Sequence, residues 1–287
     1  FSYGAVYGKN NLLRKASSAL KEAKENGKNR FEIFEQNYSI DYTKREAFIN
    51  NTNLIKSALD NDQFFPFFQG IYDNFNHNIT KFEALARIVL KDKIISPFEF
   101  LEPARLSGLL PEITKVIIDK TFKTMAKNNF SFSINITEDD LAENYLVNYL
   151  DEKIAFYKIN PNRVILEILE GVSSTGKKNH INQLTSLKSK GFKIAIDDFG
   201  AEYSNFERIL DLDIDFLKID SKYIKDIDTN KRSFEIVKAI VFFAKNVKIP
   251  CIAEFVHNEN VQKIVNNLGI NYSQGYYFSV PNKEIKN

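Results

Sequence analysis

Cysteine is nearly absent from the 287-residue sequence. The only one, Cys251, lies within the apolar stretch 249–253. One thiol cannot form a disulfide framework, so the sequence fits a reducing interior. We expect Cys251 to be a small buried side chain.

Long hydrophobic runs are also missing. The longest, such as residues 239–244, fall far short of the roughly 20 residues that span a bilayer. We therefore expect no membrane contact from this segment and a cytoplasmic location. The chain opens at Phe1 and its only methionine is Met125, so we expect the natural start to lie upstream. A membrane anchor or a sensor in that upstream part is left open as an alternative.

Charge of one sign is not in excess, because 39 basic residues face 37 acidic ones and the net charge is +2. No long-range positive field favours a nucleic-acid polymer or an anionic membrane surface. An anionic ligand must be recognised locally.

The opening segment has the pattern of strand, helix and strand over residues 1–7, 11–26 and 30–34. Its helix is indicated by apolar residues at helical spacing. We expect a polar connector over 36–45 and a helix over 46–61.

From residue 64 onward, short apolar runs alternate with amphipathic segments, which predicts a parallel sheet. The expected strands are 64–69, 80–88, 131–135, 164–168, 193–197, 216–219, 251–254 and 275–278. The expected helices are 112–127, 139–149, 181–190, 233–246 and 260–267. Eight strands predict an α/β fold with a closed (β/α)8, TIM-like barrel.

Several predicted strands finish on a polar or ionisable residue. These residues are Asn135, Glu167, Asp197 with Asp198, Lys218 and Glu254. The carboxyl ends of barrel strands converge on one face, so we expect a common pocket there. Oxygen-rich sites suit Mg²⁺ or Mn²⁺, and two ions roughly 3.5–4 Å apart can clamp a phosphodiester.

Two of these features have alternatives. Asp197-Asp198-Phe199-Gly200 either places a carboxylate between two metals or is an ordinary acidic turn. Lys218, inside an apolar strand, either has an anionic partner at the site or extends to the surface.

An ordered series of motifs resembles the EAL domain family of cyclic di-GMP phosphodiesterases over roughly residues 64–281. Its members are Glu83-Ala84-Leu85 with Arg87, Ile95-Ser96-Pro97, Ser133-Ile134-Asn135, Leu166-Glu167-Ile168-Leu169-Glu170, Asp197-Asp198-Phe199-Gly200, Lys218-Ile219-Asp220, Ala253-Glu254 and Gln274-Gly275-Tyr276. The resemblance implies a barrel with one antiparallel strand near its start. It also implies metal-dependent hydrolysis of cyclic di-GMP to linear pGpG.

The same resemblance implies a role for each matching position. The implied metal ligands are Glu83, Asn135, Glu167, Asp197 and Asp198. The implied catalytic residues are Lys218, which holds the water, and Glu254. The implied substrate contacts are Gln69, Leu85, Arg87 and Gln274, and Glu170 is implied to steady the loop after Asp198. Two Mg²⁺ or Mn²⁺ ions and a homodimer are expected on the same basis.

Residues 1–37 resemble the C-terminal end of a GGDEF, or diguanylate cyclase, domain, through Leu12-Leu13-Arg14-Lys15-Ala16 and Gly27-Lys28-Asn29-Arg30. No Gly-Gly-Asp/Glu string occurs in the chain, so cyclase activity is not expected. The alternative is a generic spacer helix. The expected domains are this remnant (1–37), a linker and helix (38–62) and the EAL-like domain (63–287).

Some positions depart from the EAL pattern. Leu169 replaces a threonine, Glu202 and Phe255 replace glycines, His257 replaces an acid, and Gly70 replaces a proline in an expected turn. His257 is interpreted as a residue of the pocket rim, with metal ligation or titration near neutral pH as alternatives. His77 and His180 are expected to be solvated. The alternatives to an active phosphodiesterase are a catalytically impaired cyclic di-GMP receptor and a structural interaction domain.

Overall fold

The computed structural model describes residues 3–5, 12–25, 31–33, 38–170, 178–200 and 212–285, which fall into two compact units, Phe1–Ser57 and Ala58–Asn287. In the first unit, strands β1 (Tyr3–Ala5) and β2 (Phe31–Ile33) pair in parallel and helix α1 (Leu12–Glu25) connects them. Helix α1 buries Ala19 and Ala23, which are four residues apart and share one helix face.

Helix α2 (Tyr38–Asp60) begins earlier than the sequence indicated. The polar connector expected over 36–45 is wrong from Tyr38 onward. The segment 38–45 contains neither glycine nor proline, so nothing in it interrupts a helix that is already favoured from residue 46.

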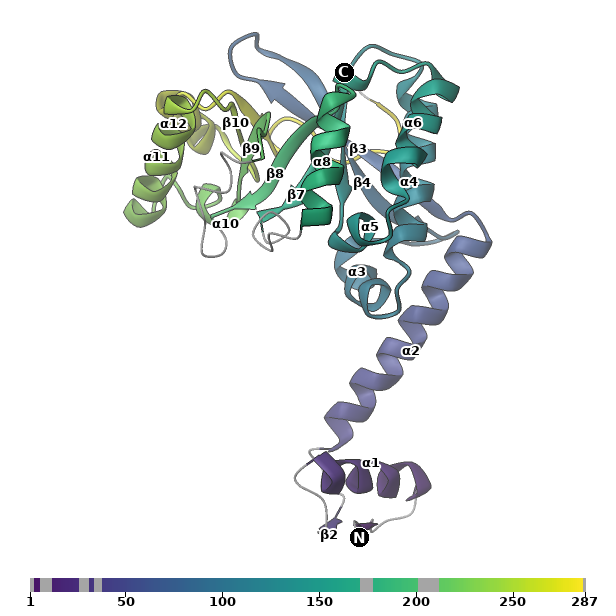
Figure 1. Ribbon diagram of the computed structural model, residues 1–287. Coiled ribbons are helices and arrows are strands. Elements are labelled where there is room, and N and C mark those ends of the chain that lie inside the picture. The colour runs from purple at the N-terminus through teal and green to yellow at the C-terminus, as the bar shows by residue number, and fades with distance from the viewer. Residues whose placement is uncertain are drawn as a thin grey trace. The chain divides into compact units, whose positions relative to one another are not determined.

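The second unit is built on a barrel of eight strands (Figure 1). They are β3 (Phe64–Asp73), β4 (Asn78–Val89), β6 (Ser131–Ile136), β7 (Val164–Leu169), β8 (Lys193–Phe199), β9 (Phe216–Ile219), β10 (Cys251–Ala253) and β11 (Tyr272–Gln274). Strand β3 pairs antiparallel with both β4 and β11, and this pairing closes the barrel. The other neighbours in the barrel run parallel. The predicted barrel with one antiparallel strand near its start is confirmed.

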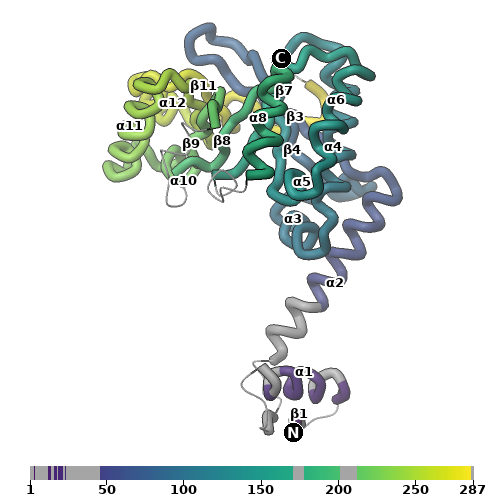
Figure 2. The backbone as a smooth tube through the Cα atoms, in the orientation of Figure 1, coloured from purple at the N-terminus to yellow at the C-terminus, as the bar shows by residue number. Residues whose placement is uncertain are grey.

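Helices follow the strands in chain order, from α4 in teal to α12 in yellow (Figure 2). The longer ones are α3 (Pro97–Leu106), α4 (Leu110–Met125), α6 (Leu146–Tyr157), α8 (Lys178–Ser189), α11 (Lys231–Asn246) and α12 (Glu259–Leu268). Shorter elements are α5 (Glu138–Ala142), α10 (Ser221–Ile224), the 3-10 helix η1 (Pro161–Arg163) and strand β5 (Ile94–Ile95), which pairs with β4.

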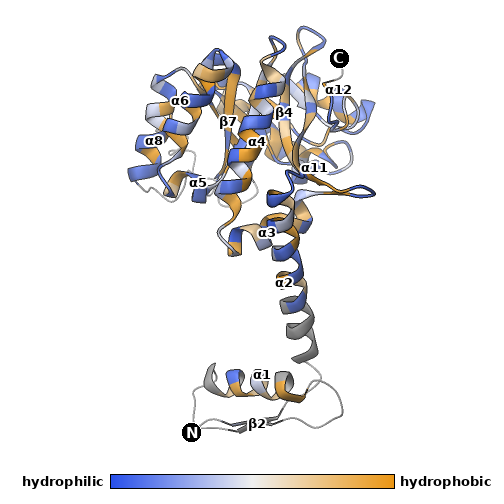
Figure 3. Ribbon diagram, turned by 90° about the vertical axis from the view of Figure 1, so that its right-hand side faces the viewer, coloured by the Kyte–Doolittle hydropathy of each residue, from blue (hydrophilic) through white to orange (hydrophobic). Residues whose placement is uncertain are grey.

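The core follows the hydrophobic periodicity of the sequence. Helix α11 buries Val237, Ile240, Val241 and Ala244, at the spacing of one helix face. Orange residues gather on the strands and on one side of the surrounding helices, whereas blue ones face outward (Figure 3). Cys251 is buried as expected, and burial raises the pKa of its thiol to about 12.

Two expected elements of the barrel are corrected. The last strand is Tyr272–Gln274 rather than 275–278, because the chain turns at Gly275, where an added Cβ would lie 2.0 Å from the Val256 carbonyl oxygen. The helix expected over 139–149 is two helices. Thr137 caps α5 in a reciprocal capping box, and Asn144, with φ 56°, separates α5 from α6.

Two smaller expectations are also wrong. Gly70 lies inside strand β3 rather than in a turn, and its N–H donates to the Ser279 hydroxyl. His180 is buried in α8, whereas His77 is exposed as expected. No helix among the described residues has the length and apolar character needed to cross a membrane.

Candidate active site

Each of the eight barrel strands, or the residue directly after it, contributes a polar side chain to one site in the barrel. In chain order these are Gln69, Glu83, Asn135, Glu167, Asp197 with Asp198, Lys218, Glu254 and Gln274. The strand pairing aligns some of them directly, because Gln69 is opposite Glu83 and Asn135 is opposite Glu167. Residues that the sequence separates by as many as 205 positions are therefore neighbours.

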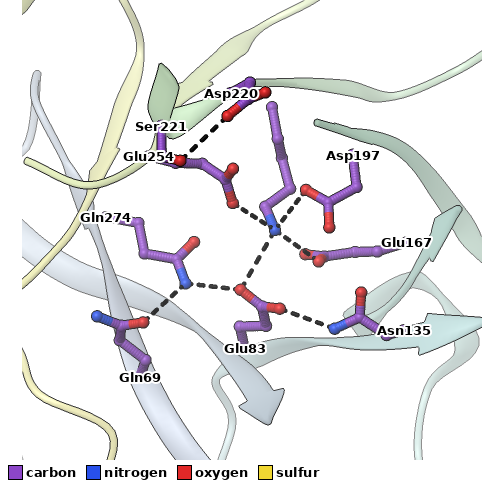
Figure 4. Close-up of polar contacts among 10 residues, drawn as sticks. Gln69, Glu83, Asn135, Glu167, Asp197, Asp220, Ser221, Glu254 and Gln274 are labelled. Carbon is purple, nitrogen blue, oxygen red and sulfur yellow. Dashed lines mark hydrogen bonds and ion pairs between the residues drawn. The ribbon is translucent and has the colours of Figure 1, made fainter. Parts of the chain in front are cut away.

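The ammonium of Lys218 is the centre of this arrangement. Its carboxylate partners point toward one another in Figure 4. It lies 2.7 Å from Glu167, 2.9 Å from Asp197, 2.9 Å from Glu254 and 3.2 Å from Glu83. Lys218 is only 1% exposed. The expected anionic partner of this lysine is thus a set of four carboxylates, and extension to the surface is excluded.

Burial and the neighbouring charges shift the pKa values of Lys218 and of its carboxylate partners. Burial disfavours the Lys218 ammonium, but the carboxylates led by Asp197 outweigh it and raise its pKa well above the usual value. Burial and neighbouring carboxylates raise the pKa of Glu167 and of Glu254. Burial would also raise the pKa of Glu83, yet Lys218 and two amide donors lower it overall. Lys218 is therefore a permanent cation in this site.

A chain of amides orients Glu83. Its two oxygens accept hydrogen bonds from the Asn135 amide (2.8 Å) and the Gln274 amide (2.6 Å). The same Gln274 nitrogen donates to the Gln69 carbonyl oxygen at 3.2 Å, and Gln69 donates in turn to the backbone oxygen of Ser279 at 2.9 Å. These contacts hold the two glutamines with their amides in defined orientations.

The acid pair Asp197-Asp198 lies at the end of β8. Asp198 has φ 53° and Gly200 has φ 96°, so the strand ends in a tight turn with left-handed residues. Oxygens of Asp197, Asp198 and Glu254 lie within 4.8 Å of one another. Burial, followed by the charge of Asp197, raises the pKa of Asp198 to about 6, as expected for crowded carboxylates.

The donor set fits divalent cations. Five carboxylates face one ammonium, which leaves a formal excess of four negative charges at the barrel mouth. One buried carboxylate oxygen, Glu167 Oε1, has no hydrogen-bond partner among the described residues. Carboxylate and amide oxygens without a thiolate or a histidine suit Mg²⁺ or Mn²⁺.

A cavity of about 350 Å³ opens beside the cluster. Its walls include Gln69, Glu83, Leu85, Ser221, Glu254, Phe255, His257, Gln274, Gly275 and Tyr276. Three of the four predicted substrate-contact residues are thus on the wall. Arg87 is not; its guanidinium donates to the Ala86 backbone oxygen at 2.8 Å.

The remaining predicted positions differ in their surroundings. Glu170 accepts a hydrogen bond from the Gly200 N–H at 3.1 Å, directly after the acid pair. Leu169 is 51% exposed. His257 is exposed at the rim, and it does not belong to the acidic cluster formed by the described residues. Glu202 lies outside the described residues.

Sequence reasoning missed two residues of the site. Ser221 lies on the cavity wall, and Asp220 accepts from its hydroxyl at 3.0 Å and from the Lys222 N–H at 2.8 Å. The backbone oxygen of Ser279 accepts a hydrogen bond from the Gln69 amide, and its hydroxyl accepts one from the Gly70 N–H. The pair Asp220-Ser221 directly after a predicted strand is a sequence signal for Ser221, because a helix N-cap commonly follows a barrel strand. A backbone oxygen such as that of Ser279 leaves no sequence signal.

Comparisons with known proteins agree with this architecture. The sequence model of the EAL domain matches residues 52–281. The chain is 32% identical over 237 residues to cyclic di-GMP phosphodiesterase PdeF of Escherichia coli (strain K12), covering 80% of this chain and 31% of PdeF. It is 29% identical over 276 residues to signaling protein YkoW of Bacillus subtilis (strain 168), covering 94% of this chain and 34% of YkoW. The chain therefore spans about a third of the length of these relatives.

Solved structures show the same fold. The EAL enzyme Bd1971, in a form with cAMP and cyclic di-GMP bound, superimposes with a TM-score of 0.79 at 27% identity, over 86% of this chain and 70% of Bd1971. The PaMucR phosphodiesterase in complex with c-di-GMP gives a TM-score of 0.77 at 25% identity, over 81% of this chain and 97% of that one.

Proposed function

Because this chain belongs to the EAL domain family, we propose that it hydrolyses cyclic di-GMP to linear pGpG with the aid of two divalent cations, Mg²⁺ or Mn²⁺. The observation that carries the proposal is the excess of four negative charges around a single buried lysine at the barrel mouth. Such an excess is stable only when cations or protons offset it.

The cation ligands follow from the positions that match the EAL family. Glu83, Asn135, Glu167 and Asp197 would hold one ion, and Asp197 and Asp198 would hold the second. Two ions in this position supply charge neutralisation for the phosphate and a water molecule of lowered pKa.

Lys218 and Glu254 handle the water molecule. Lys218 keeps its proton, so its ammonium donates hydrogen bonds that position the water and offset the charge on the phosphoryl oxygens. Glu254 has a raised pKa and lies on the cavity wall, which suits a carboxylate that takes up the proton of the attacking water.

The bond changes follow from the product. Water attacks one phosphorus atom, the bond from that phosphorus to the ribose 3′ oxygen breaks, and the leaving oxygen takes a proton. The phosphate then remains on the 5′ side, which gives pGpG. Gln69, Leu85 and Gln274 contact the nucleotide from the cavity wall, and Arg87, half-buried two residues beyond Leu85, reaches it only after a change of side-chain conformation. Glu170 holds Gly200 so that Asp198 keeps its place.

The proposal extends to the organisation of the chain. Residues 1–37, with their parallel β1-α1-β2 unit, are the end of a GGDEF-like domain, 38–62 form a linker helix and 63–287 form the phosphodiesterase domain. The domain acts as a homodimer in the bacterial cytoplasm.

The test is incubation of the purified chain with cyclic di-GMP and either Mg²⁺ or Mn²⁺, with pGpG followed by chromatography. A chelator control and the Asp197→Asn variant run in parallel. We expect pGpG only for the unsubstituted chain with metal present. Intact cyclic di-GMP under all conditions, together with measurable binding, would refute the enzyme and assign the domain as a receptor.

A further inference from the structure

Phe255, the residue after Glu254, has an unusual backbone conformation. Its φ is 58°, in the left-handed region. The other described non-glycine residues with positive φ are all polar: Asp62, His77, Asn144, Lys158, Asp198, Asp213 and Lys248. A bulky apolar residue in this region is a true outlier, and such outliers gather at functional sites.

The packing around Phe255 explains why the backbone keeps this conformation. The next residue, Val256, is fully buried, donates its N–H to the Gln274 oxygen at 2.9 Å and accepts from the Tyr277 N–H at 3.1 Å. Gly275 lies so close to Val256 that no side chain fits there. A glycine at position 255 would meet the same backbone requirement without strain, so the packing requires the conformation but not the phenyl ring.

The ring faces the cavity rather than the core. Phe255 is 53% exposed and lines the cavity that also contains Glu83 and Glu254. Tyr276 is 70% exposed on the same wall. The His257 ring lies 5.6 Å from the Phe255 ring at 54°. An exposed aromatic face beside carboxylates that hold cations suits a ligand with a phosphate at one end and a planar ring at the other.

We propose that Phe255 is a specificity-determining residue whose ring stacks on a purine base of the bound nucleotide. The inference rests on the proposed function for the identity of the nucleotide. Base stacking on an aromatic side chain corresponds to about 5- to 150-fold in affinity. The free energy of base stacking thus offsets the cost of the strained backbone at Phe255. The phosphate is bound through the cations that the carboxylate cluster holds.

The experiment compares Phe255→Gly, Phe255→Tyr and Phe255→Trp in binding titrations with cyclic di-GMP and Ca²⁺ and in turnover with Mg²⁺ or Mn²⁺. Glycine relieves the strain, so its variant folds and its unfolding midpoint should equal or exceed that of the unsubstituted chain. Phe242→Ala is the matched control, since Phe242 is 71% exposed on α11 and away from the cavity lining. The chain has no tryptophan, so Phe255→Trp gives a single fluorescent reporter at the proposed contact.

We expect Phe255→Gly to weaken binding at least fivefold, Phe255→Tyr to retain it and the nucleotide to quench the fluorescence of Phe255→Trp. Phe242→Ala should bind as the unsubstituted chain does. Equal or tighter binding by Phe255→Gly, or no binding by any form, would overturn the proposal. Normal binding without turnover would refute the hydrolytic function alone and leave the stacking contact supported.

Discussion

Replacing Lys218 by methionine removes the only cation that the described structure places among the carboxylates. Methionine fits the space of the lysine stem but leaves five carboxylates without a counter-charge. Each of the four ion pairs, at 2.7–3.2 Å, corresponds to about 5 kcal/mol at an effective dielectric constant of about 20. Proton uptake by Glu167 and Glu254, whose pKa values are already raised, limits the loss. We therefore expect the variant to lose about 3–5 kcal/mol in the free energy of unfolding without metal.

The pH dependence follows from the same carboxylates. A glutamate whose folded-state pKa lies above the ordinary value of 4.5 binds more protons in the folded state, so its contribution to stability falls as the pH rises from about 4.5 through the folded-state pKa. Loss of the ammonium moves these pKa values further up. The stability gap between Lys218→Met and the unsubstituted chain should therefore be smaller at pH 5 than at pH 8.

The assay is urea denaturation in chelator at pH 5 and pH 8, repeated with Mn²⁺. Lys153→Met is the matched control, because Lys153 is mostly buried against one carboxylate, Asp119, away from the cavity. Its loss should cost about 0–1 kcal/mol. Mn²⁺ should restore stability to Lys218→Met but not turnover, which we expect to fall at least about 100-fold. Unchanged stability in chelator at pH 8 would refute the proposed crowding of charged carboxylates.

Three further predictions follow from individual contacts. Asp197→Asn should abolish metal-dependent turnover while leaving the free energy of unfolding in chelator within about 1 kcal/mol, because it removes a ligand and a repulsive charge together; retained turnover would contradict the site. Glu170→Ala should lower turnover at least about tenfold without loss of nucleotide binding, because the Gly200 N–H loses its acceptor; loss of binding alone would contradict this positioning role. Lys81→Met should stabilise the fold at pH 7 by up to about 3 kcal/mol, because burial lowers the pKa of Lys81 to about 8. That gain in stability should shrink between about pH 8 and 10.5, because Lys81 loses its proton in the folded chain at a lower pH than in the unfolded chain. A constant gain across this range would refute the lowered pKa of Lys81.

Most of the fold was predictable from the sequence because its strands and helices have strong, separate periodicities. Seven of the eight barrel strands overlap their predicted ranges. The last strand was misplaced because Tyr272–Gln274 is short and polar, whereas the segment after Gly275 is aromatic and favours a strand locally. Close approach of Val256 to Gly275 is a long-range contact, and local preference does not report it.

The site was predictable at the level of residue types. Polar residues at the ends of apolar strands marked Asn135, Glu167, Asp197 and Lys218, since a polar side chain in a buried strand needs a partner. Which partner each one takes was not predictable. The amide chain from Ser279 through Gln69 and Gln274 to Glu83 joins the start and the end of the barrel, and only closure of β3 onto β11 brings those ends together.

The sequence by itself determined the alternation of strands and helices, the family resemblance and the acidic character of the site, because these depend on local pattern and residue chemistry. Only the tertiary structure decided that Lys218 balances four carboxylates at once. It also decided that Phe255 turns its ring toward the cavity from a strained backbone. Both features depend on the register and closure of the barrel, which set distances between side chains that are remote in the chain.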